Sequence, residues 1–229
     1  MPRPVRLNIS GIPQHITQRG NNRQACFFTP CDYQLYLGLL HDACQLHCCQ
    51  LHAFVLMTNH VHLLLTPDAP GAVSLVIRDV GRDYVRTINK AYRRTGTLWE
   101  GRFRSSLVDE EAYCLACYRY IEMNPVRAGM VRYPSEYRWS SHAFNALGEA
   151  NAILTPHSTW RGLGGMDKDR QAAYRELFKQ PLDELQIHAL RYGLRKGLPT
   201  GHEGFKRQIE QALSVSLSDG KIGRPRKLA

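Results

Sequence analysis

Apolar residues along the first part of the chain switch repeatedly between strand and helix spacing. Residues 13–20 predict a strand that ends at Arg19, and residues 32–48 place apolar side chains at helical spacing. Residues 50–66 have the pattern of a strand but are interrupted at Thr58-Asn59. This interruption predicts two strands joined by a tight turn, with the second strand beginning at His60.

Three further elements are expected before residue 125. A long helix is predicted over 71–94, a strand over 98–108, and a helix that Asp109 begins as its N-cap and that runs to about Met123. Pro125 ends this helix because proline disfavours helical geometry in the residue before it. The order β-α-β-β-α-β plus a further helix predicts an α+β fold, the ferredoxin-like split βαβ arrangement with one antiparallel sheet and helices on one face.

The composition changes after residue 139, where glycines interrupt the chain and helical segments follow. We place a domain boundary near residue 150, with a sheet domain over 1–149 and a small, mainly α-helical region over 150–229. The second region holds 14 basic and 8 acidic residues, against 16 and 12 in the first, so it is the more basic per residue.

The charge of the chain narrows the class of partner. A net charge of +10, with 23 arginines among the 30 basic residues, indicates a polyanionic partner such as nucleic acid. No apolar run approaches the roughly 20 residues that span a bilayer, and the N-terminal residues lack the apolar stretch of a secretory signal. We therefore expect a cytoplasmic, nucleoid-associated protein without membrane contact.

Seven cysteines, an odd number, fit a reducing compartment better than a disulfide framework. A zinc site built from two cysteine pairs is the alternative, but none of the spacings matches a finger or a ribbon. Small buried helix residues are the favoured interpretation, since free cysteine is among the most buried residue types.

Two histidines stand two positions apart on the strand that begins at residue 60. His60 and His62 therefore leave the same face of the sheet, where two imidazoles can bind one divalent ion. The pair alone also fits an ordinary sheet surface, so it leaves both interpretations open.

A second pair of polar residues lies at the end of the helix that precedes Pro125. Tyr120 and Asn124 are four positions apart, which makes them neighbours on one helix face. The amide oxygen of Asn124 could serve as a third metal ligand, and the phenol of Tyr120 could be aimed at a phosphate. A core-facing stripe of an amphipathic helix would give the same spacing.

These two segments resemble a known family. Thr58-Asn59-His60-Val61-His62-Leu63 and the ten residues 120–129 (YIEMNPVRAG) are similar to the two signatures of the HUH single-tyrosine transposases. The second segment resembles the branch called REP-associated tyrosine transposases. The likeness covers about residues 5–145, including the Trp99-Glu100-Gly101-Arg102-Phe103 stretch.

The resemblance implies a catalytic domain over 1–149 that acts on single-stranded DNA. His60, His62 and Asn124 correspond to the residues that hold Mg²⁺ or Mn²⁺ in the family, and Tyr120 corresponds to its nucleophile. A metal on the phosphate would orient it for in-line attack, and a covalent 5′-phosphotyrosine would conserve the energy of the bond for rejoining. Tyr118 would face away from Asn124, which favours Tyr120.

Basic side chains are candidates for contacts with the DNA backbone. The long helix carries arginines at a spacing that places them on one side, and the Gly-Arg-Pro core of residues 221–227 resembles an AT-hook, which inserts arginines into a narrow minor groove. A solvated helix face and an ordinary charged tail are the alternatives. The candidates are Arg19, Arg78, Arg82, Arg86, Arg102, Arg104, Arg127, Arg224 and Arg226.

The sequence thus predicts a DNA strand-cutting and strand-joining enzyme that recognises a hairpin or repeat. The region 150–229 would be a basic accessory DNA-binding region, and a monomer is favoured over a dimer. The main alternative is a non-catalytic DNA-binding protein or repressor that retains the fold. A replication initiator or relaxase would predict a helicase region or paired tyrosines, and neither is visible in the sequence.

Overall fold

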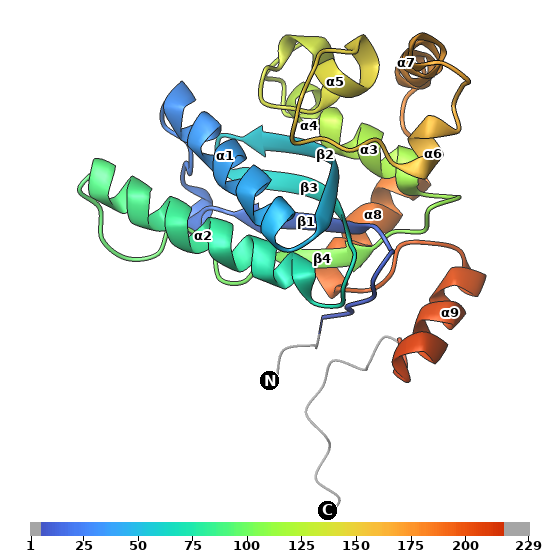
Figure 1. Ribbon diagram of the computed structural model, residues 1–229, viewed down its shortest axis with the longest axis horizontal. Coiled ribbons are helices and arrows are strands. Elements are labelled where there is room, and N and C mark those ends of the chain that lie inside the picture. Colours follow the sequence, from blue (N-terminus) through green and yellow to red (C-terminus); the bar gives the residue numbers. More distant parts are fainter. Residues whose placement is uncertain (1–5, 218–229) are drawn as a thin grey trace, which may run out of the picture.

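The computed structural model describes residues 6–217, and its centre is a four-stranded antiparallel sheet. The strands lie in the order β2-β3-β1-β4 (Figure 1). Their alternating side chains make two buried faces, which is why the strand sequences are rich in apolar residues on both sides. The bounds are β1 Gln14–Arg19, β2 Cys49–Met57, β3 His60–Pro67 and β4 Arg104–Leu107.

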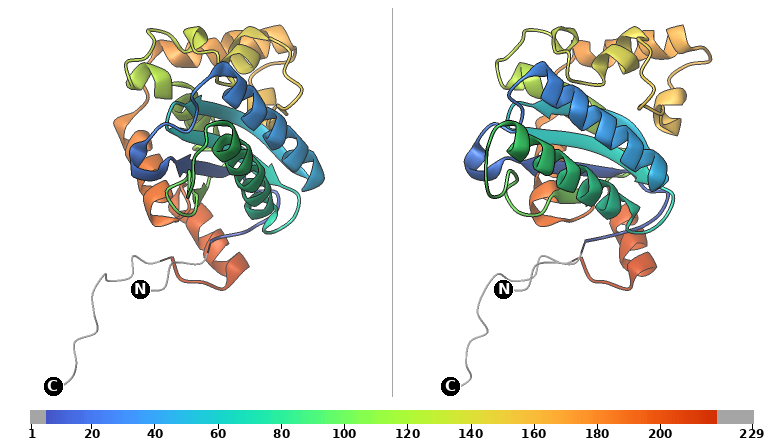
Figure 2. Two further views of the ribbon diagram at one scale, coloured as in Figure 1. Left: turned by 90° about the vertical axis from the view of Figure 1, so that its left-hand side faces the viewer. Right: turned by 60° about the vertical axis from the view of Figure 1, so that its left-hand side comes forward.

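Two crossover helices cover one face of this sheet. Helix α1 (Pro30–Leu46) joins β1 to β2, and α2 (Ala72–Ala91) joins β3 to β4. Figure 2 shows them side by side over the sheet. Ile16 and Leu63 point into the core beneath them. The expected α+β fold with the ferredoxin-like strand order is confirmed.

Helices from farther along the chain cover the opposite face, which the expectation of helices on one face did not include. Helix α3 (Cys114–Glu122) packs on β2 and β3, and α8 (Glu184–Lys196) packs on β4 and β1. Val55 and Leu64, which alternate with the residues of the first face, are buried beneath this second layer. The strands are apolar on both faces because both faces are covered.

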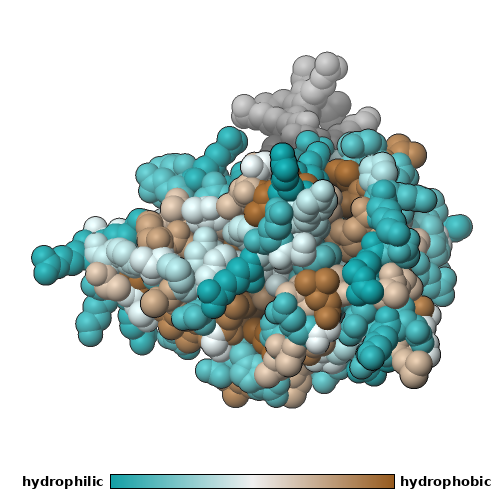
Figure 3. Space-filling model, turned by 90° about the horizontal axis from the view of Figure 1, so that it is seen from above, coloured by the Kyte–Doolittle hydropathy of each residue, from teal (hydrophilic) through white to brown (hydrophobic). Residues whose placement is uncertain are grey.

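The remaining described elements are short helices and turns. The face of the molecule that lies at the top of Figure 1 is mostly hydrophilic, with small separate hydrophobic patches (Figure 3). None of the helices within 6–217 has the length and apolar content that a membrane span requires. The elements are η1 Asn21–Arg23, α4 Asn124–Arg127, η2 Pro134–Glu136, α5 His142–Leu147, α6 Ser158–Arg161, α7 Asp167–Glu176, η3 Leu177–Lys179 and α9 Glu203–Leu213.

Two predicted elements differ from the observed ones. The strand expected over 98–108 is ordered as a strand only from Arg104, because Gly101 adopts a positive φ of 66° and bends the chain before it. The helix expected to begin at Asp109 begins at Cys114. The backbone of Asp109 instead pairs with Thr200, and its side chain accepts hydrogen bonds from the amides of the following turn.

The region beyond residue 150 packs against the sheet domain. Helix α7 lies against α5, and α8 lies against the sheet. The division near residue 150 therefore stays a prediction about how the chain is organised. The AT-hook-like segment 221–227 lies outside the described residues.

Candidate active site

The pairing of β1 with β3 gathers polar side chains on the sheet face that α3 and α8 cover. Thr17 lies opposite His62, and Arg19 lies opposite His60. Because directly paired residues leave the same face of a sheet, these four side chains project together. His15, two positions before Thr17, projects to the same face.

Tyr120 reaches this group from α3. Its ring centroid lies 5.7 Å from that of His62 and 5.5 Å from that of His15, in edge-on geometry in both cases. Tyr120 is only 5% exposed, and the guanidinium carbon of Arg127 lies 4.3 Å from its ring centroid. The two sequence motifs, separated by more than fifty residues along the chain, thus meet in space.

His15 is a site residue that the sequence analysis missed. It is fully buried, and its Nε2 lies 3.0 Å from Nδ1 of His62. If His62 binds a metal through Nε2, its Nδ1 must carry the proton and donate a hydrogen bond to Nε2 of His15, because a neutral imidazole has one donor and one acceptor nitrogen. A histidine in β1 on the same face as Thr17 and Arg19 was visible in the sequence, but its partner depended on the strand pairing.

Burial keeps the three histidines neutral. Desolvation, followed by the charge of Arg127, lowers the pKa of His15 to about 3. Desolvation and then Arg19 lower the pKa of His60 to about 4. Desolvation and the neighbouring His15 and His60 lower the pKa of His62 well below its usual value. The neutral imidazole is the form that binds metal ions.

The donor set at His60 and His62 fits a divalent metal. The two ring centroids lie 5.3 Å apart, near enough for both rings to bind one ion, since a ligating histidine nitrogen sits about 2.1 Å from its metal. Nδ1 of His60 lies 2.7 Å from the side-chain oxygen of Asn59. That contact orients the ring and leaves Nε2 as the ligating atom.

Asn124, the third predicted metal ligand, is the first residue of α4. It is 7% exposed, and its amide nitrogen donates to the backbone oxygens of Tyr120 and Ile121 at 2.9 and 3.3 Å. Its side-chain oxygen is the atom that could bind a metal. Within residues 6–217 no group of three or more His, Cys, Asp or Glu side chains could hold an ion, so a metal here would depend on two histidines, an amide and oxygens from outside the chain.

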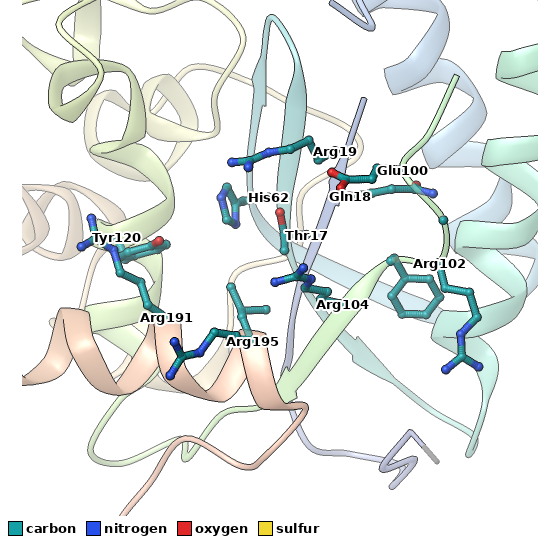
Figure 4. Close-up of a pocket in the computed structure, with 13 residues that line it drawn as sticks. Thr17, Gln18, Arg19, His62, Glu100, Arg102, Arg104, Tyr120, Arg191 and Arg195 are labelled. Carbon is teal, nitrogen blue, oxygen red and sulfur yellow. The ribbon is translucent and has the colours of Figure 1, made fainter. Parts of the chain in front are cut away.

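A pocket of about 570 Å³ opens beside Tyr120 and His62 (Figure 4). Its lining is strongly basic, with five arginines and one carboxylate, that of Glu100. His60 and Asn124 are not among the lining residues. The arginines are Arg19, Arg102, Arg104, Arg191 and Arg195.

The other predicted phosphate-binding arginines lie elsewhere. Arg78, Arg82 and Arg86 are on α2, which covers the opposite face of the sheet, and they pair with Asp79 and Asp83 at 2.8–3.9 Å. The structure does not bring them to the pocket. Arg224 and Arg226 lie outside the described residues.

The other tyrosines of this stretch are placed differently from Tyr120. Tyr118 is fully buried on the far side of α3, where its hydroxyl accepts a hydrogen bond from the backbone of His157 at 3.4 Å. Burial raises its pKa well above the usual value. Tyr113 lines a separate pocket beside α8 and α9. Neither shares the pocket of Tyr120.

Glu122 holds α3 in place from the side opposite the pocket. This carboxylate is completely buried and accepts four hydrogen bonds of 2.6–3.0 Å. The donors come from both sides of the predicted domain boundary, and they fix the helix that carries Tyr120. They are Ser141, His142, Asn145 and Tyr174.

Comparison with solved structures shows a likeness of fold. No curated protein matches the chain. A solved REP-associated tyrosine transposase bound to a REP hairpin is similar over 69% of this chain and 93% of its own, with 19% identity and a TM-score of 0.57, a likeness of fold. A putative transposase from Deinococcus radiodurans is 18% identical over 59% of this chain and 95% of its own, at a TM-score of 0.36.

The family profile described as "Transposase IS200 like" matches residues 8–124, half of the chain, and includes all of the first motif and residues 120–124 of the second. The match spans β1 to the start of α4, and therefore includes His15, His62 and Tyr120. The family expected from the two motifs is confirmed: the chain belongs to the IS200-like transposases.

Proposed function

We propose that the chain is a metal-dependent single-stranded DNA endonuclease and strand transferase that acts at hairpin-forming repetitive extragenic elements. The observation that carries this proposal is the meeting of Tyr120 with His62, at a ring distance of 5.7 Å, in one arginine-lined pocket. The solved relative bound to a REP hairpin supports the choice of DNA hairpins as the substrate class.

His60, His62 and Asn124 would hold the metal. When bound, Mg²⁺ or Mn²⁺ would neutralise charge on the phosphate oxygens and orient the ester for in-line attack. The protein contributes two neutral imidazoles whose Nδ1 atoms are engaged by Asn59 and His15. Mg²⁺ prefers a shell made only of oxygen ligands. Two imidazole nitrogens in the ligand set would therefore favour Mn²⁺ over Mg²⁺.

Tyr120 would be the nucleophile. Its phenolic oxygen would form a bond to phosphorus while the bond from phosphorus to the 3′ oxygen breaks, leaving the DNA as a 5′-phosphotyrosine. One proton leaves the phenol and one joins the 3′ oxygen, so the step is balanced. Arg127, 4.3 Å from the ring, would stabilise the negative charge that develops there. Attack by another 3′-hydroxyl reverses the step and joins strands.

The remaining basic residues would bind the DNA around this centre. Arg19, Arg102 and Arg104 line the pocket and would contact the strand backbone. Arg78, Arg82 and Arg86, with Arg224 and Arg226 of the tail, would contact flanking DNA. The enzyme would act as a monomer in the cytoplasm, on the nucleoid.

The experiment that tests this proposal is a search for the covalent adduct. Labelled single-stranded DNA that carries the repeats neighbouring the gene is incubated with protein in Mn²⁺ or EDTA, and the products are separated on a denaturing gel. Tyr120→Phe removes the nucleophile. Tyr118→Phe, on the same helix but outside the pocket, is the matched control.

The proposal predicts an adduct with wild type and Tyr118→Phe, only in Mn²⁺, and none with Tyr120→Phe. DNA binding without an adduct under every metal tried would instead support the alternative, a non-catalytic DNA-binding protein or repressor.

A further inference from the structure

Helix α8 contributes to the pocket although it lies outside the region that matches the family. The match ends at residue 124, whereas Arg191 and Arg195 line the pocket together with Tyr120 and His62. The two arginines are four positions apart and therefore share one helix face. Figure 4 shows the side chain of Arg191 reaching from α8 toward Tyr120.

The position of α8 is fixed by close packing on β4. Gly193 is buried, and a Cβ atom there would lie 2.2 Å from Oγ1 of Thr200 and 2.6 Å from Oγ of Ser106. Glycine costs a helix interior about 1 kcal/mol relative to alanine. Glycine is tolerated at position 193 because α8 approaches β4 too closely there for a larger side chain.

The segment after α8 extends this attachment. Thr200 pairs with the end of β4 through backbone hydrogen bonds of 2.8 Å to Leu107 and 2.9 Å from Asp109. Ser106 also donates a hydrogen bond of 2.6 Å to the backbone oxygen of Leu198. Because α8 is held on its inner face and at its C-terminal end, Arg191 and Arg195 are presented from a rigid support.

The charges on α8 also differ from those on α2. On α2, the exposed arginines pair with Asp79 and Asp83. Within residues 6–217, neither Arg191 nor Arg195 forms an ion pair with a carboxylate, and Arg195 lies over the ring of Tyr192 at 5.4 Å. Five arginines and a single carboxylate line the pocket, so the positive charges repel one another. A bound anion would relieve this repulsion.

We propose that α8 is a DNA-binding wall of the active site. Arg191 contacts the phosphate that Tyr120 attacks, and Arg195 contacts a neighbouring phosphate of the same strand. This proposal rests on the proposed function for the identity of the strand. It makes part of the region beyond residue 150 a component of the catalytic pocket, rather than an accessory module.

The first arm of the test measures binding alone. In full-length protein carrying Tyr120→Phe, the affinity for an oligothymidylate single strand is measured against salt concentration for Arg191→Gln, Arg195→Gln and the double variant. Lys196→Gln removes one charge from the same helix but outside the pocket, and is the matched control. Each lost phosphate contact should make the slope of log K against log salt shallower by about 0.7.

The double variant should therefore have a slope shallower by about 1.4 than the Tyr120→Phe parent, and the Lys196→Gln control should keep the slope of that parent. A double variant with the same slope as the Tyr120→Phe parent would overturn the proposal. A Lys196→Gln control whose slope becomes as shallow as that of either arginine variant would also overturn it. The salt dependence would then arise from the general positive charge of α8 and not from contacts in the pocket.

The second arm measures the rate of adduct formation with Tyr120 present and DNA at saturation. Arg191→Gln should slow the reaction about 100-fold, the size of effect seen when a donor to a developing charge is removed. Arg195→Gln should weaken binding but leave this rate near that of wild type. An unchanged rate in Arg191→Gln would overturn its assignment to the attacked phosphate.

The two arms separate this proposal from the proposed function. If wild type forms no adduct with any metal, the proposed function fails, and the binding arm still decides whether α8 holds a polyanion.

Discussion

Replacing Glu122 tests whether the buried hydrogen-bond cluster beneath α3 stabilises the fold. Glu122→Ala removes all four acceptor contacts of the carboxylate. Ser141 can turn to the backbone oxygen of Phe54, 3.3 Å away, and the amide of Asn145 also donates to the backbone of His52. The donors left without a partner are then Nδ1 of His142 and the hydroxyl of Tyr174.

The cost of the alanine variant follows from these two donors. Each unsatisfied buried group costs about 1–3 kcal/mol, and the two together cost about 4 kcal/mol in unfolding free energy. Glu122→Gln retains the volume and an acceptor oxygen. It should cost about 1–2 kcal/mol, because the Tyr174 hydroxyl can rotate to accept from the new amide.

The assay is urea unfolding monitored by circular dichroism for wild type, Glu122→Ala and Glu122→Gln. Their unfolding free energies can be compared directly if the three proteins have the same m-value. Glu149→Ala, an exposed glutamate close in sequence to the cluster, is the control and should change stability by less than about 0.5 kcal/mol. A Glu122→Ala protein within about 1 kcal/mol of wild type would show instead that water can replace the four contacts and that the cluster does not stabilise the fold.

Three further predictions address other parts of the structure. His15→Ala removes the partner of His62 Nδ1, and should weaken Mn²⁺ binding about 10–100-fold; isothermal titration measures this, and an unchanged affinity would exclude a positioning role for His15. Gly193→Ala, which would be favourable in an open helix, should destabilise the protein by about 1–3 kcal/mol because its Cβ would overlap Thr200; a stabilised variant in thermal melts would contradict the packing. Burial lowers the pKa of His52 to about 4, so below pH 6.5 the unfolded chain takes up a proton that the folded chain does not, and stability falls as the pH drops through this window. The loss attributable to His52 approaches about 3 kcal/mol at pH 4; unfolding of wild type and His52→Gln from pH 7 to 4 checks it, and parallel curves would refute it.

The sequence predicted those features of the site that depend on local spacing. His60 and His62 share a strand face, and Tyr120 and Asn124 follow one another by a helical turn, so their geometry is set by strand and helix periodicity. The order of the strands was also predictable, because β-α-β-β-α-β favours few arrangements.

Contacts between distant segments were beyond the reach of the sequence. The partnership of His15 with His62 depends on the register of β1 against β3. The place of Arg191 in the pocket depends on how α8 crosses β4, and the identity of Gly193 alone did not reveal that close approach. Gly101 shortened β4 through a backbone conformation that an apolar pattern does not encode.

Peptide mapping of the adduct identifies the tyrosine that forms the covalent bond to DNA. Trypsin cuts after Arg119 and Arg127, so residues 120–127 are released as a peptide whose single tyrosine is Tyr120. Tyr113 and Tyr118 fall in the preceding peptide, residues 105–119. After nuclease and trypsin digestion of the adduct, mass spectrometry should find a 5′-nucleotide on the peptide 120–127 and none on 105–119. A nucleotide on 105–119 would instead assign the attack to Tyr113 or Tyr118, which lie outside the pocket that holds His62.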